Sequence, residues 1–195
     1  QFSGRESDIH ERIRAKMARN VYGLDLGSYE IKVYDKKKDT IWKEKNVIAI
    51  ANKKEVFAVG DEAYEMFEKA PDNIEVVFPM KEGVISRFYD MQYLLNNLLK
   101  KERHFARGSK YVVAVPTDVT EVEKKAFFDL VVHSTAKAKE VNIVERAVAD
   151  AIGIGLDIQD SPGICIVNLG SETTELSVLA SGGMVFNKLV KIGGT

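Results

Sequence analysis

Two stretches of the chain carry residue types that can bind a phosphate group. In residues 21–34, apolar and polar residues alternate on both sides of Asp25, Gly27 and Ser28, which predicts a strand, a tight turn and a second strand. Gly27 suits a backbone that bends sharply or approaches a ligand closely, because it has no Cβ. The N–H groups of such a turn converge on one point, as they do where a protein holds a phosphate. Taken alone, this stretch is more typical of an ordinary hairpin turn.

A second stretch, residues 164–178, repeats this plan far along the chain. A strand leads through Asn168 and an apolar residue to Gly170, a hydroxyl-rich turn follows, and a second strand resumes. Two copies of one strand–turn–strand unit fit two half-domains that face each other across a nucleotide. The pair therefore favours a nucleotide-binding protein over two unrelated hairpins.

With these two turns the chain resembles the actin-like ATPase superfamily, and within it the MreB/Mbl family of bacterial cytoskeletal actins. Six segments carry the resemblance, in the family's order: 23–27, 58–63, 79–85, 115–116 with 119–123, 149–155 and 173–175. The resemblance implies an α/β fold. This would be an actin-like (ribonuclease H-like) layered domain with a small α+β outer subdomain inserted, plus the opening strands of a second lobe.

The resemblance also implies a division of the chain into segments. These are a core subdomain of the first lobe at 21–34 and 108–162, the outer subdomain at 35–107, and an incomplete second lobe at 163–195. Because the chain stops as the second lobe begins, we expect a truncated chain or an incomplete paralogue with little affinity for ATP.

Residues 1–20 are mostly polar and charged, with a narrow apolar stripe at Ile9, Ile13 and Met17. Some members of the family carry an N-terminal amphipathic membrane anchor, but no Trp, Phe or Leu strengthens this stripe. We expect a solvated or weakly docked polar helix or tail, or residues introduced by cloning, rather than a membrane helix.

Composition narrows the class of protein. A hydrophobic content of 45% supports a folded core, and a net charge of −1 argues against a nucleic-acid partner, which would call for a basic stripe. The single cysteine, Cys165, lies in an apolar strand, so we expect it to be buried in a protein of a reducing compartment. No apolar run approaches the roughly 18 residues that span a bilayer. We expect a cytoplasmic protein, with membrane association left open.

The first half of the chain predicts a hairpin turn at 35–39, strands at 40–42, 47–51 and 56–59, and two helices. We expect Asp61 to cap a short helix that buries Ala63, Phe67 and Ala70 and ends near Pro71. Five apolar residues recur with helical spacing over 90–101: Met91, Leu94, Leu95, Leu98 and Leu99. We interpret this stripe as core packing rather than a filament interface.

The second half alternates strands and helices, as a layered α/β domain does. The apolar run 111–115 predicts a strand buried on both faces, and Thr120 with Glu123 predicts a capping box. The helix that follows should turn five residues inward: Val122, Ala126, Phe127, Leu130 and Val131. A strand at 141–144, a small-residue helix over 147–155 and a hairpin turn at 181–183 complete the prediction.

The resemblance implies which residues bind nucleotide. They are Asp25, Gly27, Ser28, Tyr29, Glu30 and Lys32 in the first loop, and Asn168, Gly170, Ser171, Glu172, Thr173 and Thr174 in the second. Asp25 would hold Mg²⁺ through water, with ATP as the nucleotide.

The chain departs from the family pattern in both loops. Glu30 stands where the family has Asn, and a carboxylate there repels phosphate oxygens. Lys32 could neutralise Glu30, although we expect strand alternation to separate the two side chains. In the second loop Asn168 replaces an acid that Mg²⁺ would favour, and Ser171 with Glu172 replaces two glycines.

A third departure concerns hydrolysis. The family's glutamate that positions the attacking water aligns with Arg146, whose guanidinium is always charged and cannot act as a base. The neighbouring Glu145 is the remaining candidate, yet it would point about 100° away around a helix. Together the three departures predict a weak or lost ATPase.

We therefore expect a divergent filament-forming MreB-like protein that acts in cell shape, with a degenerate ATP site. Its partners would be further copies of itself and membrane-associated morphogenesis proteins. The alternative is a pseudo-ATPase scaffold or adaptor, because residues 28–32 also look like the turns of FtsA and the pilus-assembly actin relatives. A sugar kinase or chaperone ATPase fits least, since no substrate-binding signature is present.

Overall fold

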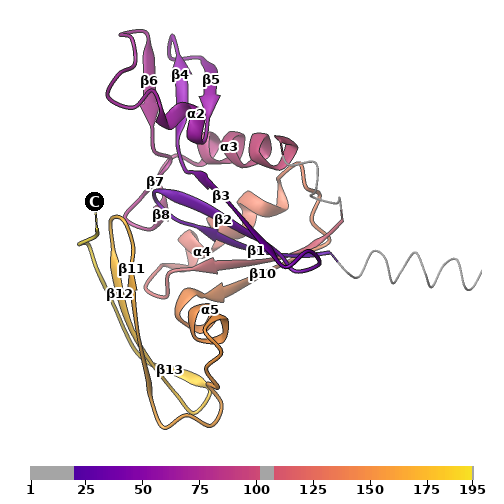
Figure 1. Cartoon of the computed structure of the whole chain (residues 1–195), viewed down its shortest axis with the longest axis vertical. Helices are drawn as coiled ribbons and strands as arrows, with labels where there is room; N and C mark the ends of the chain where they lie inside the picture. The colour runs from indigo at the N-terminus through magenta and orange to yellow at the C-terminus, as the bar shows by residue number, and fades with distance from the viewer. Residues whose placement is uncertain (1–19, 102–107, 195) are drawn as a thin grey trace, which may run out of the picture.

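The computed structural model describes residues 20–101 and 108–194, and its centre is a mixed five-stranded sheet in the order β10-β9-β1-β2-β3 (Figure 1). The strands are β1 (Val21–Leu26), β2 (Glu30–Asp35), β3 (Thr40–Lys45), β9 (Lys110–Val115) and β10 (Glu140–Glu145). β1 pairs antiparallel with β2 and parallel with β9, so the first glycine turn and the carboxyl ends of β9 and β10 lie at one edge. The predicted strand–turn–strand unit at 21–34 is confirmed.

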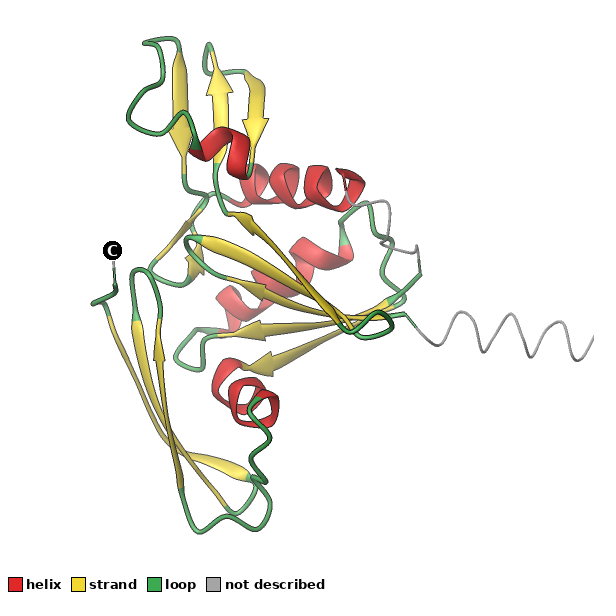
Figure 2. Cartoon of the chain, in the orientation of Figure 1, coloured by secondary structure: helices red, strands yellow, loops and turns green. Residues whose placement is uncertain are grey.

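Two helices pack on one face of this sheet, namely α3 (Phe88–Lys101) and α4 (Glu121–Val132) (Figure 2). The predicted leucine stripe of α3 is fully buried in the main core, as the 3.6-residue period requires. α4 begins with the predicted capping box: Thr120 accepts from the Glu123 N–H, and Glu123 accepts from the Thr120 N–H. Val122, predicted to face inward, is 78% exposed, because it lies on the opposite side of the helix from the buried Val131.

The prediction that β9 is buried on both faces is wrong. Tyr111, Val113 and Val115 are buried against the helices, whereas Val112 and Ala114 are only half-buried on the other face of the sheet. An unbroken apolar run cannot distinguish a strand covered on both faces from one covered fully on a single face.

A smaller three-stranded sheet with a short helix forms a separate layer beyond α3 (Figure 1). It comprises β4 (Ile48–Ala51), β5 (Glu55–Val59), β6 (Ile74–Val77) and α2 (Asp61–Tyr64). β3, which also falls within the segment 35–107, joins the central sheet instead.

Asp61 does not cap α2, contrary to the prediction. Gly60 occupies the cap position, and the Asp61 N–H donates to the carboxylate of the buried Glu44. The helix closes after Tyr64, so Phe67 lies beyond it and is 39% exposed, while Ala63 is buried as predicted. A glutamate from a distant strand, which no local pattern indicates, therefore sets this helix start.

The rest of the chain forms a two-stranded hairpin and a second sheet beside α5 (Arg146–Gly153). The hairpin is β7 (Met80–Lys81) with β8 (Val84–Ile85); the sheet is β11 (Ile164–Leu169), β12 (Thr174–Ala180) and β13 (Gly183–Val190). The predicted turn at 181–183 joins β12 to β13. Cys165 is exposed, which corrects the prediction: Ile166 packs toward α5, and strand alternation turns Cys165 to the opposite face.

The expectation for residues 1–20 falls almost wholly outside the described residues. Within the described ranges, no helix combines the length and the apolar character that a bilayer crossing requires.

Candidate functional site

Both glycine turns lie in the wall of one cleft of about 530 Å³ between the central sheet and the β11–β12–β13 sheet. The first turn and its strands contribute Asp25, Gly27, Ser28, Tyr29, Glu30 and Lys32 to the lining. The second contributes Asn168, Gly170, Ser171, Glu172 and Thr173, and α5 adds Arg146 and Asp150. Two segments far apart in the sequence therefore face the same space, which is large enough for a phosphate-bearing ligand.

The two turns share one backbone geometry. The Gly27 N–H donates to the Glu30 carbonyl over 3.1 Å, and the Gly170 N–H donates to the Thr173 carbonyl over 2.8 Å. A Cβ at Gly27 would lie 2.8 Å from the Glu30 oxygen, and one at Gly170 would lie 2.9 Å from the Thr173 oxygen. Any side chain at either position would force the turn open, so both turns require glycine for close backbone approach.

Asn46 fixes the first turn through two hydrogen bonds. Its side-chain amide donates to the Gly27 carbonyl over 2.7 Å, and its backbone N–H donates to the Tyr29 carbonyl over 2.8 Å. The residue is fully buried. Sequence reasoning missed it; the one available signal was a polar residue directly before the apolar run 47–51.

The tip of the β7–β8 hairpin contacts both turns. The Gly83 N–H donates to Ser28 Oγ over 3.0 Å, and the Glu82 N–H donates to the Glu172 carboxylate. Lys191, just after β13, forms an ion pair with Glu82 and lowers the pKa of that carboxyl below its ordinary value. This hairpin therefore links the first glycine turn to the second.

Asp25 is paired with two cations. Its Oδ1 lies 3.3 Å from Arg146 Nη2, and its Oδ2 lies 3.3 Å from Lys32 Nζ. The Arg146 residue is only 8% exposed, whereas the Lys32 side chain is 45% exposed. These contacts join the first turn to the start of α5.

The expected separation of Glu30 from Lys32 by strand alternation is wrong. Residues two apart on β2 share a face, and both line the cleft. They are nevertheless not partners, because Lys32 binds Asp25 while Glu30 lies 3.7 Å from Lys43 of β3.

Asp150, on the same face of α5 as Arg146, accepts a 2.7 Å hydrogen bond from the Asn168 side-chain amide. Burial raises the pKa of the Asp150 carboxyl above its ordinary value, with the Asn168 hydrogen bond and the charge of Arg146 opposing that rise. Sequence reasoning did not single out Asp150. Its spacing of four residues from Arg146 was the available signal.

Two expected site residues lie outside the lining of the cleft. Glu145 is the last residue of β10, one position before the helix that carries Arg146. Thr174 begins β12, and its hydroxyl donates to the Ile192 carbonyl. The neighbouring Glu175 is 3% exposed and accepts from the Thr117 N–H and from the Asn187 amide, so it ties β9's end to the second sheet.

Tyr29 extends the site toward the outer layer. Its hydroxyl donates to that of Tyr64 over 2.9 Å, and Lys45 Nζ lies 4.0 Å from the centre of its ring. Tyr64 in turn stacks on Phe67. The first turn is thus joined to α2 by an aromatic contact that the sequence pattern did not indicate.

Comparison with known proteins identifies relatives of this chain. The profile described as MreB/Mbl protein matches residues 19–195. The cell shape-determining protein MreB of Escherichia coli is 34% identical over 186 residues, covering 91% of this chain and 53% of the relative. The cell shape-determining protein Mbl of Bacillus subtilis is 32% identical over 180 residues, with the same coverage. The chain thus spans about half the length of the curated relatives it matches.

Solved structures of related proteins have the same fold as this chain. MreB5 of Spiroplasma citri bound to ADP superposes with a TM-score of 0.82 at 29% identity, covering 91% of this chain and 53% of that one. The MamK double helical filament, at 19% identity and a TM-score of 0.70, shows the same fold. Fold class and family resemblance are both confirmed, and the chain belongs to the MreB/Mbl protein family.

Proposed function

We propose that this chain is part of a filament-forming, actin-like cytoskeletal protein that acts in cell-shape determination and binds adenine nucleotide between its two glycine turns. The single observation that carries the nucleotide site is the shared cleft, in which Gly27 and Gly170 form turns of the same geometry. Relatives named for cell shape and a related structure bound to ADP support the assignment.

We propose further that hydrolysis is slow or absent. Arg146 occupies the position expected for the residue that positions water, and its guanidinium pairs with Asp25. Glu145 stays outside the lining of the cleft. The position aligned with the family's water-positioning glutamate therefore offers no carboxylate to act as a general base, and the nucleotide would act as a bound ligand rather than a rapidly consumed substrate.

Self-association and location are also part of the proposal. Among the structural relatives, MamK forms a double helical filament. We propose that the protein containing this chain assembles with further copies of itself in the cytoplasm, and that membrane-associated morphogenesis proteins are its other partners.

Nucleotide titration and sedimentation of the chain, each with and without ATP, test the proposal. We expect weak but saturable ATP binding and phosphate release near the buffer background, with pelleting that increases when nucleotide is added. A chain that stays monomeric and binds no nucleotide would reject this function. Pelleting that ignores nucleotide would favour the alternative, a constitutive scaffold or adaptor. Glu172 favours that alternative, because its carboxylate already ties the second turn to the hairpin.

A further inference from the structure

We propose that the cleft binds the phosphates of its nucleotide without a divalent cation, because Lys32 and Arg146 supply the positive charge that a metal ion would provide. This inference rests on the proposed nucleotide function and specifies the chemistry of that site.

The carboxylate best placed to hold a metal ion is already neutralised. Asp25 was expected to hold Mg²⁺ through water, yet each of its oxygens faces a cation: Arg146 at Oδ1 and Lys32 at Oδ2, both at 3.3 Å. A divalent ion bound there would displace two charge-assisted contacts or lie beside two positive charges. Either outcome weakens metal binding at Asp25.

The second turn does not supply a metal ligand to replace Asp25. Asn168 offers an amide where Mg²⁺ favours a carboxylate, and this amide donates its N–H to Asp150. The other cleft carboxylates are engaged as well: Glu30 with Lys43, and Glu172 with the Glu82 N–H. Across residues 20–101 and 108–194, no group of three or more His, Cys, Asp or Glu is arranged to hold a metal ion. The donor set does not fit Mg²⁺.

The same two cations have donors left for an anion. Arg146 uses Nη2 for Asp25, and its buried Nε has no hydrogen-bond partner among the described residues. A guanidinium carries five N–H donors and favours phosphate oxygens, and an ammonium carries three. Lys32 lies in the lining of the cleft with its side chain partly open to solvent. A phosphate can therefore be held by fixed side-chain charges on β2 and α5.

The test is an NMR titration of the full chain with ADP, following the amide signals of Gly27 and Gly170, once with EDTA and once with excess MgCl₂. We expect the dissociation constants in the two conditions to agree within about threefold, less than the tenfold step that 1.4 kcal/mol represents. MnCl₂ added alone should leave both signals sharp, because its paramagnetic broadening requires a nearby metal site.

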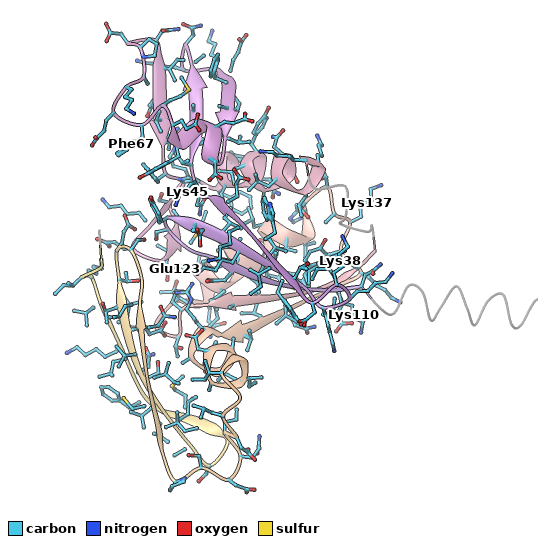
Figure 3. The ribbon with its side chains drawn as sticks, viewed as in Figure 1. Lys38, Lys45, Phe67, Lys110, Glu123 and Lys137 are labelled. Carbon is cyan, nitrogen blue, oxygen red and sulfur yellow. The ribbon has the colours of Figure 1, made fainter. Side chains whose placement is uncertain are left out.

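Three variants test whether Lys32 and Arg146 supply the positive charge that binds the phosphates. Lys32→Gln removes a partly exposed ammonium and should weaken ADP binding in EDTA about tenfold, the loss expected for a charge-assisted contact. Lys110→Gln is the matched control, because Lys110 pairs with Glu140 at the far end of the central sheet from the cleft (Figure 3), and it should bind as the parent does. Arg146→Gln with Asn168→Asp removes a cation and restores an acid, so its ADP binding should become dependent on Mg²⁺.

The outcomes separate the two proposals. If Mg²⁺ tightens ADP binding of the parent chain tenfold or more, or if Mn²⁺ alone broadens Gly27, the metal-free inference is overturned while nucleotide binding stands. If ADP leaves both signals unmoved in either condition, the inference and the proposed nucleotide function are both overturned. Equal loss of binding in Lys32→Gln and Lys110→Gln would reject the assignment of the charge to the cleft.

Discussion

Among single residues, Asp150 shows how the cleft sets the charge of a carboxyl group. Burial raises its pKa, so the folded protein holds the proton of Asp150 more tightly than the unfolded chain does. The sign follows from linkage. The contribution of the Asp150 proton to the free energy of unfolding is fully present below the ordinary Asp pKa of about 3.9. It is lost as pH rises through the higher pKa of the folded state.

Asp150→Asn should therefore raise the melting temperature at pH 7, since the amide avoids burial of a charge and can still accept from Asn168. The gain should vanish near pH 3, where the parent carboxyl is protonated in both states. Thermal unfolding of both proteins across this range is the measurement. A lower melting temperature at pH 7 would show instead that the charged Asp150 stabilises Arg146.

Gly60 lies at a position where the surrounding structure permits only glycine. Its φ is +66° and its ψ is −138°, and a Cβ there would overlap the side chain of Glu44. Gly60→Ala should destabilise the chain by about 2 kcal/mol or more, because that backbone region is essentially reserved for glycine. Denaturant unfolding should show the loss. Gly153→Ala, at the end of α5 with open space around it, is the control and should be neutral or slightly stabilising.

Among the elements, α4 depends on a local signal. Its capping box satisfies the Glu123 and Thr120 N–H groups at the helix start. Thr120→Ala should lower the free energy of unfolding by about 1 kcal/mol, while Thr120→Ser, which keeps the hydroxyl, should lose much less. Chemical denaturation of the two variants compares them. Equal losses would mean that the Thr120 methyl group, rather than the cap, stabilises the helix.

The elements also show the limit of local signals. The leucine stripe of α3 and the box of α4 were predicted correctly, because both depend on residues within one or two turns. The start of α2 was not, because Glu44 on β3 supplies its N-terminal acceptor across 17 positions. When a distant side chain sets the start or end of a helix, the sequence of the helix itself contains no signal for that boundary.

At the scale of the whole molecule, the β7–β8 hairpin joins the two glycine turns. The ion pair of Lys191 with Glu82 lies beside the contact of Glu172 with the Glu82 N–H. Because Lys191 lowers the folded pKa of Glu82, this pair is present above the ordinary Glu pKa. It is lost as pH falls through the lowered value.

Lys191→Met should therefore loosen the junction at neutral pH. Amide hydrogen exchange should become faster at residues 82–83 and 193–194, with little change in α3, whose apolar stripe is buried in the main core. Lys188→Met, on β13 and with no ion pair assigned within the described residues, should leave exchange at the hairpin unchanged. Acidification of the parent chain through the lowered pKa of Glu82 should reproduce the effect of Lys191→Met. Unchanged exchange in Lys191→Met would mean that the remaining contacts, such as that of Glu172 with the Glu82 N–H, hold the junction without the ion pair.

The amino-acid sequence by itself determined the local geometry of this protein. The two glycine turns, the buried stripe of α3 and the cap of α4 follow from backbone sterics and from spacings of a few residues. Only the tertiary structure decided which charges meet. Arg146 reaches Asp25 across 121 positions, Asn168 binds Asp150, and Lys32 pairs with Asp25 rather than Glu30. Electrostatic partners are chosen by distance in space, which a linear spacing of residues does not encode.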